Sequence, residues 1–199
     1  ATVRPRFLHT LPPRRSSDLE GPELVLIAVT EADLHEQLVN VPAVWKDRIA
    51  LLQNELLPGD WQKYDLEPTV ISVWFEKKKG QDSKVIVPSP VFGKHAQLIA
   101  DALAVIDIAA TVLADEAALL HELVLKNVYI LTTNISGLEV GGNVGQLWEK
   151  HNAVAYDVAI DVISLQEALI GQPLEHQQLI DGRSEERRVG KECRSWGWR

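Results

Sequence analysis

A short apolar run, a helical segment and a second apolar run constrain the fold of this chain most strongly. Residues 24–29 (LVLIAV) are continuously apolar and partly β-branched, as in a strand buried on both faces. Thr30 can cap the helical pattern that follows, with Asp33 as a weak capping-box partner, and the pattern ends near Asn40. Residues 48–53 (RIALLQ) predict another buried strand. Strand, helix and strand within about 30 residues predict a right-handed parallel crossover.

The following segment predicts further strands and one helix around the same sheet. Residues 69–75 (TVISVWF) and 84–87 (KVIV) have the pattern of a hairpin. The lysine-rich connection between them is more typical of a solvated turn than of a phosphate site. Gly93 is expected to open a helix that runs through Ala104, and residues 111–113 to add a last strand. These elements predict an α/β unit with a mixed sheet.

From residue 115 onward the pattern is almost entirely helical. The first predicted helix, over residues 116–134, places two asparagines on an apolar stripe, which consists of Leu120, Val124, Asn127, Leu131 and Asn134. A buried amide without a partner costs roughly 1 to 3 kcal/mol, so each amide is expected to bond either across a helix interface or to a ligand. A second helix is predicted over residues 144–170, ended by Gly171 and Pro173.

The two ends of the chain differ in composition from its middle. Both ends are rich in arginine and net basic, whereas the middle is strongly acidic and contains Arg48 as its single arginine. Residues 8–19 (LHTLPPRRSSDL) and 183–195 (RSEERRVGKECRS) resemble translations of a sequencing adapter read on opposite strands. We therefore expect residues 1–19 and 183–199 to be disordered cloning scars rather than a basic arm that binds nucleic acid.

Composition also narrows the classes of partner. The middle contains no cysteine, because Cys193 lies in the C-terminal tail, so neither disulfides nor thiolate metal sites are expected there. The histidine spacings match no zinc motif, and we predict no metal site. No apolar run approaches the roughly 20 residues of a membrane helix. An acidic surface disfavours nucleic acid. The expectation is a cytoplasmic protein with a small-molecule partner and no nucleic-acid or membrane partner.

Several phrases of the middle, taken in order, resemble the ketopantoate reductase family, within the wider group of β-hydroxyacid dehydrogenases. They are LVLIAVTEADL (24–34) with LLQN (51–54), VPSPVFG (87–93), ELVLKN (122–127) and LQEALIGQPL (165–174). The resemblance implies an α/β fold, the C-terminal part of a Rossmann-like sheet over residues 20–114, followed by an all-helical domain over residues 115–182. It also implies hydride transfer between NADPH, or NADH, and a 2-keto acid across the cleft between the two parts.

The resemblance assigns two residues to the cofactor side of this cleft. Asn54 corresponds to the asparagine of the family's QNG turn, where it contacts cofactor or substrate. Thr30 stands where a lysine usually follows the strand in the family. Both residues directly follow predicted strands.

On the substrate side, the resemblance assigns Asn127 to a substrate-binding asparagine, and Asn134 shares its stripe. Leu123 occupies the position of the family's catalytic lysine. Lys126 lies three residues later and projects from nearly the same helical face. Lys126 is therefore the expected catalytic cation, which would stabilise a developing alkoxide and deliver its proton, with a surface lysine as the alternative interpretation.

Two elements of the family pattern are missing from this sequence. The glycine-rich GxGxxG turn that receives the dinucleotide pyrophosphate is absent, as are the serine and acid that follow the helical domain's end. We therefore expect an inactive interior fragment of a reductase that does not bind NADPH with submicromolar affinity. The alternative is a non-catalytic sensor or interaction module, which Thr30 and Leu123 favour. The apolar helical stripes also predict a homodimer through the helical domain.

Overall fold

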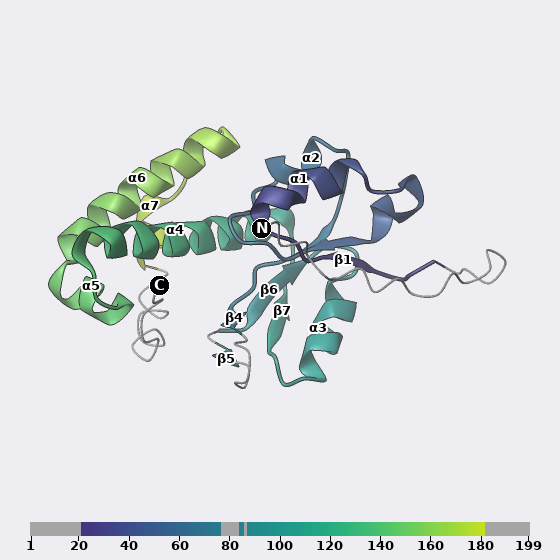
Figure 1. Cartoon of the computed structure of the whole chain (residues 1–199), viewed down its shortest axis with the longest axis horizontal. Coiled ribbons are helices and arrows are strands. Elements are labelled where there is room, and N and C mark those ends of the chain that lie inside the picture. The colour runs from purple at the N-terminus through teal and green to yellow at the C-terminus, as the bar shows by residue number, and fades with distance from the viewer. Residues whose placement is uncertain (1–20, 77–83, 86, 182–199) are drawn as a thin grey trace, which may run out of the picture.

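A mostly parallel sheet and a lobe of helices lie side by side in this molecule (Figure 1). The computed structural model describes residues 21–76, 84–85 and 87–181. The adapter-like tails and the lysine run of residues 77–79 lie outside the described residues. The predicted fold class, an α/β unit followed by an all-helical part, is confirmed.

The main sheet has five strands in the order β1-β2-β3-β6-β7. They are β1 (Val25–Ile27), β2 (Ile49–Leu51), β3 (Thr69–Ile71), β6 (Ser89–Phe92) and β7 (Ala110–Val112). The pairs β1–β2, β2–β3 and β6–β7 are parallel, and β3–β6 is antiparallel. The predicted mixed sheet and its last strand are therefore confirmed.

Helices cover both faces of this sheet, and strand β2 shows why. Its residues alternate, so that Ile49 and Leu51 pack with α1 (Glu31–Val39) while Ala50 packs with α3 (Ala96–Ala104). All three are at most 1% exposed. A strand buried on both faces reads as a continuous apolar run, which is the pattern found in the sequence.

The predicted parallel arrangement of strand, helix and strand is confirmed, with one local correction. Helix α1 leads from β1 to β2 through the 3-10 helix η1 (Ala43–Arg48). Thr30 occupies the N-cap position of α1 in extended backbone, but its side chain does not cap the helix. The hydroxyl instead donates to Asp33 Oδ2 at 2.8 Å. Thr30 therefore stabilises the first turn through the Asp33 side chain.

The predicted hairpin of residues 69–75 and 84–87 is wrong in its first strand. β3 ends at Ile71 and pairs with β6, whereas the hairpin consists of β4 (Phe75–Glu76) and β5 (Lys84–Val85). Between β3 and β4 the chain leaves the sheet, since the Trp74 amide donates to Ser89 Oγ at 2.9 Å. Strand β6 is not among the predicted strands; it contains Pro90 and follows Pro88.

The helical part consists of α4 (Glu116–Val140), α5 (Val144–Lys150), α6 (Asn152–Ile170) and α7 (His176–Asp181). The single helix predicted over residues 144–170 is wrong, because the helix breaks at His151 with φ −132° and ψ 32°. Gly171 ends α6 in left-handed backbone, as predicted. In the ranges that the structure describes, no helix combines the length and apolarity needed to cross a bilayer.

Helix α4 joins the two parts of the molecule (Figure 1). Near its start, Leu119 and Leu123 are buried in one core with α1, β1 and the short helix α2 (Gly59–Gln62). Further along, Val124 and Val128 are fully buried in a second core with α6 and α7. Burial of one leucine or valine side chain contributes roughly 1.5 to 3 kcal/mol, so both cores hold α4 in place.

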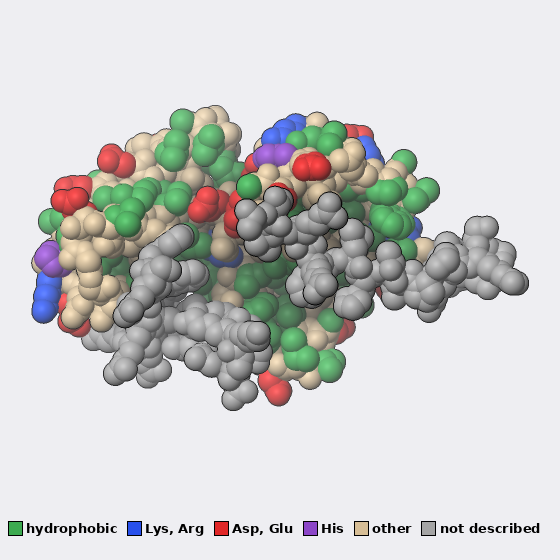
Figure 2. Space-filling view, viewed as in Figure 1, with side chains coloured by type: hydrophobic (Ala, Val, Ile, Leu, Met, Phe, Trp, Pro, Cys, Tyr) green, Lys and Arg blue, Asp and Glu red, His purple; other side chains and the backbone are tan. Residues whose placement is uncertain are grey.

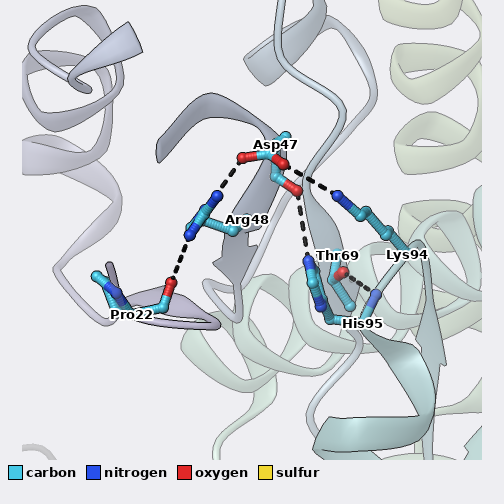
Figure 3. Close-up of polar contacts among 6 residues, drawn as sticks. All are labelled: Pro22, Asp47, Arg48, Thr69, Lys94 and His95. Atoms are coloured by element: carbon cyan, nitrogen blue, oxygen red, sulfur yellow. Dashed lines mark hydrogen bonds and ion pairs between the residues drawn. The ribbon is translucent and has the colours of Figure 1, made fainter. Parts of the chain in front are cut away.

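A cluster of polar contacts lies at the edge of the sheet where strands β2 and β3 begin (Figure 3). Asp47 accepts hydrogen bonds from Lys94 at 3.0 Å and from Arg48 at 3.1 Å. These bonds lower the pKa of Asp47 to about 2. Arg48 also donates to the Pro22 carbonyl, and the His95 amide donates to Thr69 Oγ1. The cluster connects the start of β1, η1, β3 and the segment before α3.

Gly93, between β6 and α3, provides a test of this packing. Its φ is +120°, and a Cβ placed there would lie 2.7 Å from Thr69 Cα and 3.0 Å from the Pro68 carbonyl oxygen. We expect Gly93→Ala to lower the free energy of unfolding by about 3 kcal/mol or more, measured by urea denaturation. The matched control is Gly59→Ala, because nothing lies within 4 Å of its built Cβ. Equal stabilities of the two variants would contradict this account.

Candidate functional site

The carboxyl ends of three parallel strands and one face of α4 meet at the edge opposite the Asp47 cluster. Thr30 follows β1, Asn54 follows β2, and Trp74 follows β3. Trp74 packs against Tyr129 of α4, with ring centroids 5.5 Å apart. In open α/β sheets, ligands bind outside the carboxyl ends of the strands. Figure 2 shows that the surface is hollowed between the helical lobe and the α/β lobe.

Lys126 is buried at this junction. The side chain is on the same helical face as Leu119 and Leu123, at steps of seven and three residues, and is 3% exposed. Its Nζ has no hydrogen-bond partner among the residues that the structure describes. Burial lowers the pKa of Lys126 from 10.5 to about 8, and the charge of Glu31 at the start of α1 opposes this shift. The alternative interpretation of Lys126 as a surface lysine is wrong.

Glu122 lies one helical turn before Lys126 on the same face of α4. Its side chain is half-buried, and this burial raises the pKa of its carboxyl group, while the neighbouring His121 opposes the shift. Burial thus favours the neutral form of both groups. An acid and an amine whose pKa values shift toward neutrality are suited to exchanging protons, a property common at functional sites. The family resemblance assigned no role to Glu122. The available signal in the sequence was its place in the ELVLKN phrase, which also contains Lys126 and Asn127.

Asn127 makes the helix-packing hydrogen bonds that the sequence left open as one alternative. Its Nδ2 donates to the Leu56 carbonyl at 3.3 Å and to Gln166 Oε1 at 3.1 Å. Asn127 is 1% exposed and Gln166 is 3% exposed. The three residues come from α4, α6 and the segment after β2. Asn127 therefore links the helical part to the segment that also carries Asn54.

The other candidate residues lie on the surface. Thr30 and Asn54 are exposed at the carboxyl ends of neighbouring strands. Between these ends, Gln53 is buried and donates through Nε2 to the Ile27 carbonyl at 2.7 Å. Asn134 is also exposed, about 10 Å along α4 from Asn127, and does not share the burial of Asn127. The structure thus groups Lys126 and Asn127 at the junction and leaves Asn134 outside it.

The donor set of this site contains amide, hydroxyl, amine and carboxyl groups. Within the described ranges, no three histidine, cysteine or acidic side chains are grouped so that they could hold a metal ion. The side chains present can form hydrogen bonds and transfer protons.

Solved structures of known proteins share this architecture. No family model and no curated protein matches the sequence. Among solved structures, the chain is similar to 2-dehydropantoate 2-reductase from Methylococcus capsulatus, with a TM-score of 0.60 and 15% identity over 89% of this chain and 61% of that one. The chain has a ketopantoate reductase-like fold. It spans less than two thirds of the length of this neighbour.

Two further neighbours agree on the fold. A probable 2-dehydropantoate 2-reductase from Bacillus subtilis gives a TM-score of 0.55 at 14% identity, over 91% of this chain and 64% of that one. A D-mandelate dehydrogenase in a ternary structure with NADH and anilino(oxo)acetate gives 0.56 at 14% identity, over 84% of this chain and 58% of that one. The predicted resemblance is therefore confirmed at the level of fold.

Replacing Asn127 tests its role in packing. Asn127→Ala leaves the Gln166 oxygen and the Leu56 carbonyl without this donor, so we expect the free energy of unfolding to fall by about 2 kcal/mol. Asn134→Ala on the same helix is the matched control and should leave stability unchanged or slightly higher, because alanine favours a helix. A double variant with Gln166→Ala should be less destabilised than the sum of its two single changes. Full additivity would show that the two amides are not coupled.

Removing the buried charge of Lys126 should stabilise the fold at neutral pH. The folded pKa is about 8 against the ordinary 10.5, so between these values the unfolded chain binds more protons and stability rises with pH. Below pH 8, burial of the charge costs about 3 kcal/mol. We therefore expect Lys126→Met to unfold at higher urea concentration than wild type at neutral pH, by up to this amount. The advantage should shrink as the pH approaches 10.5.

The control for this comparison is the exposed Lys150 of α5. Lys150→Met should change stability by no more than ~0.5 kcal/mol at either pH. A Lys126→Met variant that is less stable than wild type at neutral pH would contradict the cost assigned to the buried charge.

Proposed function

We propose that this chain belongs to an NAD(P)H-dependent reductase that converts a 2-keto acid into a 2-hydroxy acid. The observation that carries the proposal is Lys126, a buried amine at the carboxyl edge of a parallel sheet. The fold supports it, since the neighbours include 2-dehydropantoate 2-reductases and a D-mandelate dehydrogenase with bound NADH. In this proposal, residues 20–114 form part of the nucleotide-binding domain and residues 115–182 part of the substrate domain.

In the reaction, the carbonyl oxygen of the keto acid gains negative charge and then a proton. Lys126 in its ammonium form stabilises this charge and donates the proton, because its pKa of about 8 makes proton release favourable near neutral pH. Asn127, held by Leu56 and Gln166, fixes the height of α4 over the strand ends and thereby positions Lys126. Asn134 is exposed and lies two helical turns from Asn127, so it has the least support among the proposed substrate contacts.

The described residues fit one side of a dinucleotide. Thr30 and Asn54 are exposed polar groups at the carboxyl ends of adjacent parallel strands, where doubly wound folds bind such ligands, and they would hold NADPH or NADH there. When bound, the cofactor supplies the hydride. The sequence contains no GxGxxG turn for the pyrophosphate. For this reason we propose that the 199 residues alone are inactive and bind NADPH only weakly.

A reductase assay tests the function. A panel of 2-keto acids is screened with NADPH and with NADH, using the complete reading frame that contains these residues, and nicotinamide oxidation is followed. We expect Lys126→Ala to lower kcat/KM by about 100-fold or more, because a positioned proton donor contributes that much. Lys150→Ala is the matched control and should retain the wild-type rate. Equal rates for wild type and Lys126→Ala would remove Lys126 from the mechanism, and no turnover of any keto acid would reject the reductase.

A non-catalytic sensor or interaction module is the second candidate function. It is favoured by Leu123, which stands at the position of the family's catalytic lysine and is packed into the core at 2% exposure. A leucine provides neither a charge nor a proton at that position. An intact glycine-rich turn in the complete reading frame would favour the reductase over the module.

A homodimer through the helical part is proposed from its surface. Large apolar side chains are exposed on α4 and α6, among them Ile135, Leu138, Tyr156, Ile160, Leu165 and Leu169. Exposed apolar patches of this kind often mark interaction sites.

A further inference from the structure

Lys126 has the properties of a nucleophilic amine as well as those of a proton donor. A lysine at a surface is held as a hydrated ammonium ion, whose nitrogen has no free lone pair. Lys126 is 3% exposed, and its Nζ has no hydrogen-bond partner among the described residues. This burial makes the unprotonated amine more accessible near neutral pH than it is in a surface lysine. Desolvation of a lysine is one of the ways in which proteins activate it as a nucleophile.

The groups around Lys126 favour chemistry at a carbonyl. Glu31, at the start of α1, is the acidic group whose charge acts on Lys126 from the α/β part. Glu122 lies one turn away on α4 itself, with His121 beside it, and burial raises the pKa of the Glu122 carboxyl. A carboxyl group with a raised pKa holds its proton to a higher pH than an ordinary carboxyl group and can protonate a leaving hydroxyl group. Lys126 and Glu122 thus provide a nucleophile and an acid on one helical face.

We propose that the Lys126 amine forms an imine with the carbonyl carbon of a small 2-keto acid, with Glu122 as the proton carrier. The nitrogen lone pair adds to the carbonyl carbon, and one proton passes from the nitrogen to the oxygen to give a carbinolamine. Glu122 then protonates the hydroxyl group, which leaves as water while the C=N bond forms, and the nitrogen returns its remaining proton to the Glu122 carboxylate. One amine and one ketone give one imine and one water, with no change in oxidation state. This activity goes beyond the proposed reductase and needs no nicotinamide.

Reductive trapping tests the proposal on the 199-residue chain itself. The protein is incubated with pyruvate and sodium cyanoborohydride, which reduces the imine to a stable secondary amine, and the adduct is located by peptide mapping. We expect Lys126 to be modified at least tenfold faster than the exposed Lys150 near pH 8. The pKa of about 8 predicts that the rate at Lys126 levels off above that pH.

Two variants complete the experiment. Lys126→Arg keeps the charge and removes the nucleophile, so the fast adduct should disappear. Glu122→Gln removes the proton carrier, so the adduct should still form at Lys126 but at least several-fold more slowly. If Lys126→Arg does not fold, the peptide map of the wild-type chain still shows whether Lys126 carries the adduct.

Two outcomes would overturn the imine proposal: no adduct at Lys126, or an adduct spread over exposed lysines at a similar rate. Its failure is distinguishable from failure of the reductase, because the trapping reaction contains neither NADPH nor NADH. A reductase whose activity depends on Lys126 but which gives no trapped adduct would use this lysine for proton transfer only.

Discussion

The burial of α4 on two sides is the constraint on which this structure depends. Leu119 and Leu123 belong to the core of the sheet and α1, while Val124 and Val128 belong to the core of α6 and α7. A helix with apolar side chains on two faces cannot be stable in isolation, because either face alone would leave the other in water. The burial of Lys126 and Asn127 on α4 follows from this double packing.

The sequence correctly predicted elements that depend on one apolar run or on local backbone conformation. The continuous apolar run at residues 24–29 predicted the first strand, and the glycine at position 171 predicted the end of α6. The predicted burial of the first strand on both faces is wrong, because Leu26 of β1 is 52% exposed. Strand β6 was missed because Pro88 and Pro90 normally punctuate turns, and only its pairing with β3 and β7 makes it a strand. The break at His151 was missed because the apolar spacing continues across it.

The candidate site was predictable in part for similar reasons. The apolar stripe of α4 predicted that Asn127 needs a hydrogen-bond partner, and Leu56 and Gln166 provide partners that lie far away in the sequence. The burial of Lys126 was harder to foresee, since a lysine is rarely buried without a counter-charge. Its seven-residue spacing from Leu119 was the available signal. The exposure of Asn134 was not predictable from its place on the apolar stripe of α4.

The continuous length of α4 has a mechanical consequence. A helix of 25 residues is about 37 Å long, and no glycine or proline interrupts it before Gly137. An uninterrupted helix of this kind moves as one rigid body, so a displacement of one end is transmitted to the residues that lie over the strand ends. A small tilt imposed on its distal end by α5 or α6 would move the amine of Lys126 relative to Glu31 and change the proton affinity of that amine.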